Sequence, residues 1–112
     1  METLLEYKGD TMIVRLMGEL DQHYATQLRR AIDTQVTNRG IHKIVFDFSN
    51  VGFMDSSGIG VIMGRYRLMQ SIGGRVCAFG ISPRVDKLIE MSGIKRIVNI
   101  YADEQTALRK EG

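Results

Sequence analysis

Stretches with the two-residue period of a β-strand alternate with stretches of helical period along this chain, and no other sequence feature restricts its fold as much. In one stretch Tyr24, Leu28 and Ile32 recur every four residues, which is typical of one face of an amphipathic helix. In another, Ile44 and Phe46 alternate with residues of the opposite face, which is typical of a strand. Strands are predicted in residues 4–8, 11–17, 43–48, 75–81 and within 94–100, and helices in residues 21–40, 55–73, 82–93 and from 103 onward.

The order of these elements predicts a mixed sheet. Gly9-Asp10 separates the first two strands, and such a two-residue spacer is typical of a tight antiparallel hairpin. The later strands alternate with helices, which predicts parallel pairing through right-handed crossovers. The expected order is ββαβαβαβα, an α/β fold with a mostly parallel five-stranded sheet, an antiparallel hairpin at its start and packed helices. The chain has 112 residues and no Pro-rich or Ser-rich linker, so one domain is expected over residues 1–112.

Composition argues against several classes of protein. Lys and Arg number 15 and Asp and Glu 13, a net charge of +2, whereas a dedicated nucleic-acid binder is usually more basic. Every apolar stretch is far shorter than the ~20 residues that cross a bilayer, and residues 1–3 do not resemble the start of a signal peptide. We therefore expect a cytoplasmic protein that contacts neither nucleic acid nor membrane.

Cys77 is the single cysteine, so neither a disulfide nor a multi-cysteine metal site is expected, and no metal or cofactor is predicted. Arg65 and the other scattered arginines are expected to be solvated.

The tetrapeptide Asp55-Ser56-Ser57-Gly58 is the candidate functional segment, because it places a carboxylate and two hydroxyls where the third strand meets the second helix. Ligand sites of open α/β sheets cluster at the carboxyl ends of strands, and a helix N-terminus presents unpaired amides to an anion. A phosphate on Ser56 fits such a position. Asp and Ser are also preferred N-cap residues, so a purely structural cap explains the same sequence, and both interpretations stay open at this point.

Two catalytic or nucleotide-binding interpretations of this segment fit less well. A serine nucleophile on a strand-to-helix turn requires Gly-x-Ser-x-Gly, but Met54 stands two residues before Ser56. A dinucleotide fingerprint requires a third glycine after Gly58-Ile59-Gly60, at the position of Met63. Close packing of the helix on the sheet is the simpler explanation for Gly60 and for Gly64, four residues later.

A receiver domain is a third alternative, because it carries a phosphoryl group at the end of a strand. Its acceptor is an aspartate that works with an acidic metal pair, and its order starts βα. This chain starts ββ, and Glu19 and Asp21 are expected to lie away from the third-strand turn.

Residues 53–66 read FMDSSGIGVIMGRY, which resembles the signature of the anti-sigma factor antagonists, the bacterial members of the STAS-domain family. The resemblance covers nearly the whole chain. The paired serines followed by Gly-Arg-Tyr are most similar to the branch of the family that acts on the anti-sigma factor of sigma-F in sporulation. Four further stretches fit the same family: Gly18-Glu19-Leu20-Asp21, Ile72-Gly73-Gly74, Ile81-Ser82-Pro83 and Met91-Ser92-Gly93.

The resemblance implies a regulatory switch that is not itself an enzyme. In this family the unphosphorylated antagonist binds an anti-sigma factor that is also a serine kinase, and the sigma factor is released. Phosphorylation of the first serine of the pair, here Ser56, inactivates the antagonist, and a PP2C-type phosphatase reactivates it. The match implies that Asp21, Asp55, Ser56, Ser57 and Gly58 bind the partner. Asp21 and Asp55 each precede a predicted helix, so an N-cap role is open for both.

A second interpretation within the same family is a STAS interaction module of another regulatory assembly, such as a stress-signalling scaffold, with or without modification of Ser56. The partner separates the two interpretations, since it is an anti-sigma kinase in one and another STAS protein in the other. We expect the free protein to be a monomer.

Overall fold

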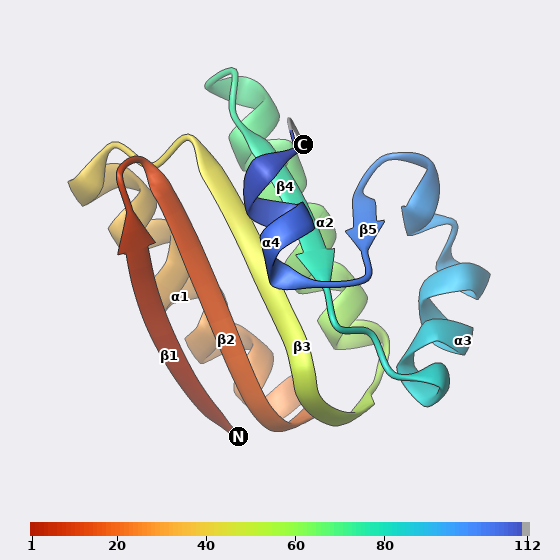
Figure 1. Cartoon of the computed structure of the whole chain (residues 1–112). Helices are drawn as coiled ribbons and strands as arrows, with labels where there is room; N and C mark the ends of the chain where they lie inside the picture. The colour runs from red at the N-terminus through yellow and green to blue at the C-terminus, as the bar shows by residue number, and fades with distance from the viewer. Residues whose placement is uncertain (111–112) are drawn as a thin grey trace.

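The computed structural model describes residues 1–110, which form a five-stranded sheet with helices on both faces (Figure 1). The last two residues of the predicted domain, 111 and 112, lie outside the described residues. In chain order the elements are β1 (Glu2–Lys8), β2 (Thr11–Leu20), α1 (Gln22–Arg39), β3 (Lys43–Met54), α2 (Ser56–Ser71), β4 (Arg75–Phe79), α3 (Pro83–Ser92), the 3-10 helix η1 (Ile94–Arg96), β5 (Asn99–Tyr101) and α4 (Glu104–Arg109).

The strands lie in the sheet in the order in which they occur in the sequence, β1-β2-β3-β4-β5. β1 and β2 pair antiparallel across a turn in which Gly9 has φ +60°, a left-handed conformation that favours glycine. The other three pairs are parallel. The predicted fold class, element order and N-terminal hairpin are confirmed.

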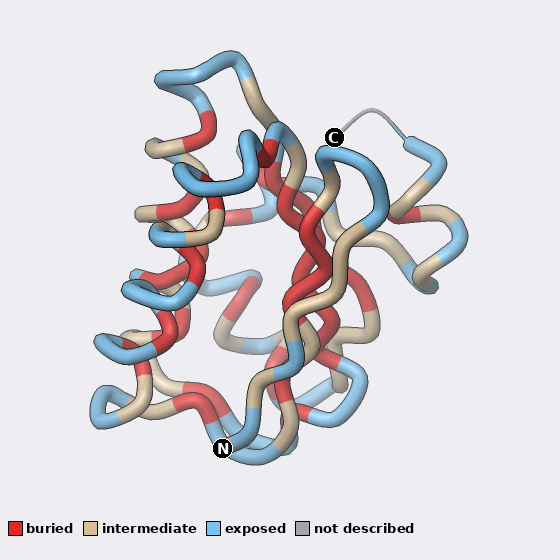
Figure 2. The backbone as a smooth tube through the Cα atoms, turned by 90° about the vertical axis from the view of Figure 1, so that its left-hand side faces the viewer, coloured by how far each residue is buried: buried red, intermediate tan, exposed pale blue. Residues whose placement is uncertain are grey.

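The two faces of the sheet bury separate apolar clusters. Ile44 and Phe46 belong to the larger cluster, on the face covered by α1, α2 and α3. Val45 and Cys77 point to the other face, where Ala107 of α4 covers them. Figure 2 shows buried residues running through the central strands and recurring along the helices. Burial raises the pKa of the Cys77 thiol to about 11. All helices among the described residues are too short or too polar to span a membrane.

The strands that lead to the candidate site are longer than predicted. β2 continues to Leu20 and β3 to Met54, so the segment left between the predicted strand 43–48 and the predicted helix 55–73 is part of β3. The pairing of β2 with β3 shifts register twice, and these β-bulges break the alternation that sequence periodicity relies on. At the other end of the chain, β5 is shorter than its apolar run because Ile94–Arg96 forms a 3-10 turn.

Arg65 is not solvated, contrary to the expectation. Only 7% of the residue is exposed, and its Nε lies 2.9 Å from Oδ1 of Asp33, so it pairs α2 with α1. Burial lowers the pKa of Arg65. A signal was present in the sequence, since Arg65 stands four residues from the buried Val61 and Met69 and shares their helix face.

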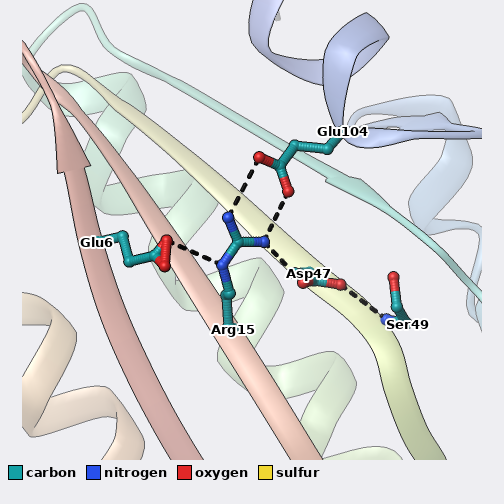
Figure 3. A network of polar contacts seen from close by, with 5 residues as sticks. All are labelled: Glu6, Arg15, Asp47, Ser49 and Glu104. Atoms are coloured by element: carbon teal, nitrogen blue, oxygen red, sulfur yellow. Dashed lines mark hydrogen bonds and ion pairs between the residues drawn. The ribbon is translucent and has the colours of Figure 1, made fainter.

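An ionic cluster on the α4 side of the sheet is centred on Arg15 of β2 (Figure 3). Its Nε donates to Glu6 at 3.0 Å, and its Nη1 donates to Asp47 at 2.9 Å. Both terminal nitrogens donate to Glu104 of α4, at 2.7 and 3.2 Å. The second oxygen of Asp47 accepts a bond of 2.9 Å from the amide of Ser49. One guanidinium therefore joins β1, β2, β3 and α4.

The opposite end of α4 is held by Lys43 of β3. Its Nζ donates to the carbonyl of Ala107 at 2.7 Å and also to that of Lys110, at the end of a helix where carbonyls lack intrahelical partners. Glu104 fixes the first turn through Arg15. Polar contacts at both ends thus hold this short helix over the buried Cys77.

Replacing Arg15 with Met is expected to destabilise the protein by about 2 to 4 kcal/mol at neutral pH, because Asp47 is buried and would lose its cation. Glu6→Gln is the matched control. Its carboxylate is 38% exposed, so the loss should stay below about 1 kcal/mol. Urea denaturation measures both, and equal losses in the two variants would contradict a central role for Arg15.

The stabilisation by this cluster is expected to decrease in acid. The bond from Arg15 holds the pKa of Glu104 below its ordinary value of 4.5. The contribution is therefore fully present above that value and is lost as the pH falls through the lowered pKa. Urea titrations along a falling pH series should show the gap between wild type and Arg15→Met narrowing in this window, and a constant gap would refute the assignment.

Candidate functional site

The parallel pairing of β2 and β3 brings two helix starts side by side. Leu20 is in register with Met54, and the amide of Asp55 donates to the carbonyl of Leu20 at 3.3 Å. Asp21 follows the last residue of β2, and Asp55 follows the last residue of β3. The candidate residues of the first and second helices therefore meet at one edge of the sheet.

This adjacency corrects one argument made against a receiver domain. Glu19 pairs with Phe53, so Glu19 and Asp21 lie beside the third-strand turn and not away from it. The expectation was wrong because β3 ends at Met54, six residues beyond the end of the predicted strand at residue 48. Within residues 1–110, no group of three or more His, Cys, Asp or Glu side chains is arranged to hold a metal ion.

Asp21 and Asp55 are N-caps, as the capping interpretation predicts. Oδ1 of Asp21 accepts a bond of 3.0 Å from the amide of Tyr24, and Oδ1 of Asp55 accepts one of 2.8 Å from the amide of Ser57. Each bond satisfies an amide that has no partner within the helix. Each cap uses one oxygen of its carboxylate, and the second oxygen can accept a bond from another molecule.

The two serines of the pair occupy different surroundings. Ser56 is the first residue of α2 and is exposed, whereas Ser57 is partly buried and faces a pocket between α1 and α2. A group on Ser56 would lie at the amino end of a 16-residue helix, where amides and the helix dipole favour negative charge. The pocket has a volume of about 240 Å³ and is lined by Gln22, Ala25, Thr26, Arg29, Ser57, Gly60 and Val61. Sequence reasoning missed it because it forms only when two separate helices pack together.

Gly58 is the glycine of this segment that packing requires. A Cβ there would lie 2.2 Å from Cγ of Met54 and 3.1 Å from Cδ2 of Leu20, so the first turn of α2 rests directly on the ends of β2 and β3. Gly60 and Gly64 differ, because a Cβ at either would meet no atom within 4 Å. The expectation that these two glycines serve close packing is wrong.

The site and the fold have clear counterparts among known proteins. The STAS domain model matches residues 3–107. A relative from Paenibacillus polymyxa named anti-sigma F factor antagonist is 41% identical over 104 residues, which are 93% of this chain and 89% of the relative. The solved structure of the anti-sigma factor antagonist SpoIIAA in its unphosphorylated form matches with a TM-score of 0.84 and 33% identity, over 94% of this chain and 92% of that chain. The structure of the Bacillus cell fate determinant SpoIIAA in the phosphorylated form matches with a TM-score of 0.77 and 32% identity, over 96% and 98%.

Gly58→Ala is expected to destabilise the protein by about 1 to 3 kcal/mol, because Met54 has to move to admit the new methyl group. Gly60→Ala is the matched control in the same helix, and there alanine should stabilise the protein by up to about 1 kcal/mol through helix propensity. Urea denaturation of both variants gives the sign of each change. The same sign in both would contradict the packing described for Gly58.

Asp55→Ala is expected to cost about 1 kcal/mol of stability through loss of the cap to Ser57. Asp55→Asn keeps an oxygen acceptor and removes the charge, so it should stay within a few tenths of a kcal/mol of wild type. Thermal and urea unfolding distinguish them. If both variants lose the same stability, charge and not the hydrogen bond accounts for the role of Asp55.

Proposed function

Because the chain belongs to the STAS domain family, we propose that it is an anti-sigma factor antagonist of the sporulation type, switched by phosphorylation of Ser56. In its unphosphorylated form it binds an anti-sigma factor that is also a serine kinase, and so frees the sporulation sigma factor. Phosphorylation by that kinase ends the interaction, and a PP2C-type phosphatase restores it. The chain is the substrate of both enzymes and is not itself catalytic.

The main support for this proposal is the exposed position of Ser56. It is the hydroxyl of the pair that a kinase can reach without rearrangement of the helices, since Ser57 is partly buried against the pocket between α1 and α2. Asp55 fixes the backbone on both sides of the acceptor through its bond to the amide of Ser57. Ser56 is thus presented on a rigid helix start next to the neighbouring cap, Asp21.

The switch acts through charge and volume at the docking surface while the fold is retained. A phosphate adds about −1.5 to −2 charge and three acceptor oxygens beside Asp55. The amino end of α2 stabilises that charge within the chain. This added charge and volume repel an acidic or tightly packed partner surface. The similarity of this chain to both the unphosphorylated and the phosphorylated form of SpoIIAA supports a switch without refolding.

Asp21, Asp55, Ser56, Ser57 and Gly58 form the proposed contact with the partner, in two different ways. Asp21 and Asp55 offer carboxylate oxygens at the edge of the sheet. Gly58 is buried and acts indirectly, by seating the first turn of α2 against Met54. We place the switch in the cytoplasm, as a monomer between binding events.

Incubation with ATP and the anti-sigma F factor of the same bacterium, followed by intact-mass spectrometry, tests the proposal. Wild type should gain one adduct of about 80 Da, the mass of a phosphoryl group. Ser57→Ala should keep this adduct and Ser56→Ala should lose it, because Ser56 is exposed whereas Ser57 is partly buried.

Loss of the adduct only in Ser57→Ala would move the acceptor by one residue. No adduct on wild type with an active kinase would favour the alternative, an interaction module that pairs with another STAS protein. Circular dichroism of the phosphorylated form should match that of the free form, and loss of helical signal would refute a switch that keeps the fold.

A further inference from the structure

A β-bulge turns Phe53 out of the core, three residues before the proposed phosphoacceptor. At the ends of the strands Glu19 is in register with Phe53, and Leu20 with Met54, after a register shift that leaves Gly52 as the extra residue. Leu20 and Met54 are buried, so Glu19 and Phe53 point to the opposite face of the sheet. Phe53 is 41% exposed and is the single aromatic side chain among the exposed large apolar residues in the described part of the chain.

No described helix covers this part of the sheet. α4 lies over the first half of β3, since Glu104 reaches Asp47 through Arg15 and Ala107 packs with Val45. Phe53 stands six residues further along β3, roughly 20 Å for an extended strand. Figure 1 shows α4 over one half of the sheet and the ends of β1, β2 and β3 near the N-terminus without a helix in front. We call this uncovered surface the open sheet end, formed by the outward residues Glu2, Leu4, Met17, Glu19 and Phe53.

The open sheet end has an apolar centre and an acidic surround. Leu4 is 48% exposed and Phe53 41%, while Met17 is partly buried. Residues 2–7, 16–21 and 49–56 contain no Lys, Arg or His. Arg15, in register with Leu4, borders this surface, and its charge is paired with Glu6, Asp47 and Glu104. Apart from Glu6, which pairs with Arg15, the acids in these three segments are Glu2, Glu19, Asp21 and Asp55. A complementary surface is therefore basic at its rim and apolar where it receives Phe53.

We infer that Phe53 is an aromatic anchor for the anti-sigma factor, so that the partner docks across the open sheet end as well as on the start of α2. This inference rests on the proposed function. The surface is continuous with Asp55 and Ser56 through the last two residues of β3. Desolvated aromatic side chains at the centre of an interface contribute most of its binding energy, and an arginine of the partner can stack on the ring. Phosphorylation of Ser56 then switches a contact to which Phe53 contributes.

Isothermal titration calorimetry of the anti-sigma F factor from the same bacterium against wild type, Phe53→Ala and Ile72→Ala tests this inference. Ile72 is the matched control, because it is 43% exposed and follows the far end of α2. Phe53→Ala should weaken binding about tenfold or more, and Ile72→Ala less than about twofold. Phe53→Thr, which keeps a β-branched strand former, should weaken binding as much as alanine does.

Circular dichroism and urea unfolding verify that each variant is folded. If Phe53→Ala is unstable, the affinity of Phe53→Thr for the anti-sigma factor is compared with that of wild type instead. Equal affinities for wild type, the folded Phe53 variant and Ile72→Ala would overturn the role of Phe53 and leave the proposed function intact, provided wild type still binds and is phosphorylated. If wild type neither binds the anti-sigma factor nor gains a phosphate, the proposed function fails and the anchor fails with it.

Discussion

The parallel pairing of β2 with β3 is the constraint on which the rest of the site depends. Its final register places Leu20 beside Met54, and the bond from the amide of Asp55 to the carbonyl of Leu20 extends the pairing to the first residue beyond the strands. Two helices then start from adjacent positions, each behind its own aspartate. The absence of a side chain at Gly58 lets α2 rest on these strand ends, so the core directly positions the proposed phosphoacceptor.

In the proposed function, fold stability and recognition depend on the same residues at this edge. Asp21 and Asp55 complete the hydrogen bonding of their helices with one oxygen and present a carboxylate at the surface. Such an arrangement holds these proposed docking groups rigid before a partner arrives, which would reduce the entropy lost on binding. A phosphate on Ser56 would add its charge to a helix end already built to tolerate anions, so the modification changes the surface without threatening the fold.

Sequence periodicity predicted the elements, their order and the mixed sheet, because each strand or helix carries its own apolar pattern. The local motif Asp55-Ser56-Ser57-Gly58 made Asp55 and Ser56 candidates, and their role stays a proposal. Sequence periodicity ended β3 too early, because two bulges interrupt the alternation after Phe48. Because of that error, sequence analysis did not predict the adjacency of Asp21 and Asp55 or the outward orientation of Phe53. Both depend on the register between two strands, which neither strand encodes alone.

The ionic cluster also sets an order of events during synthesis. Arg15 and Glu104 are 89 residues apart in sequence, so β1, β2, α1 and β3 leave the ribosome before the last carboxylate of the cluster is made. Domains generally fold as units, so the cluster forms only when the whole domain is available. A chain without α4 leaves Val45 and Cys77 uncovered on that face of the sheet. That apolar strip is covered only once α4 has been made, and the bond from Arg15 to Glu104 then holds the helix in place.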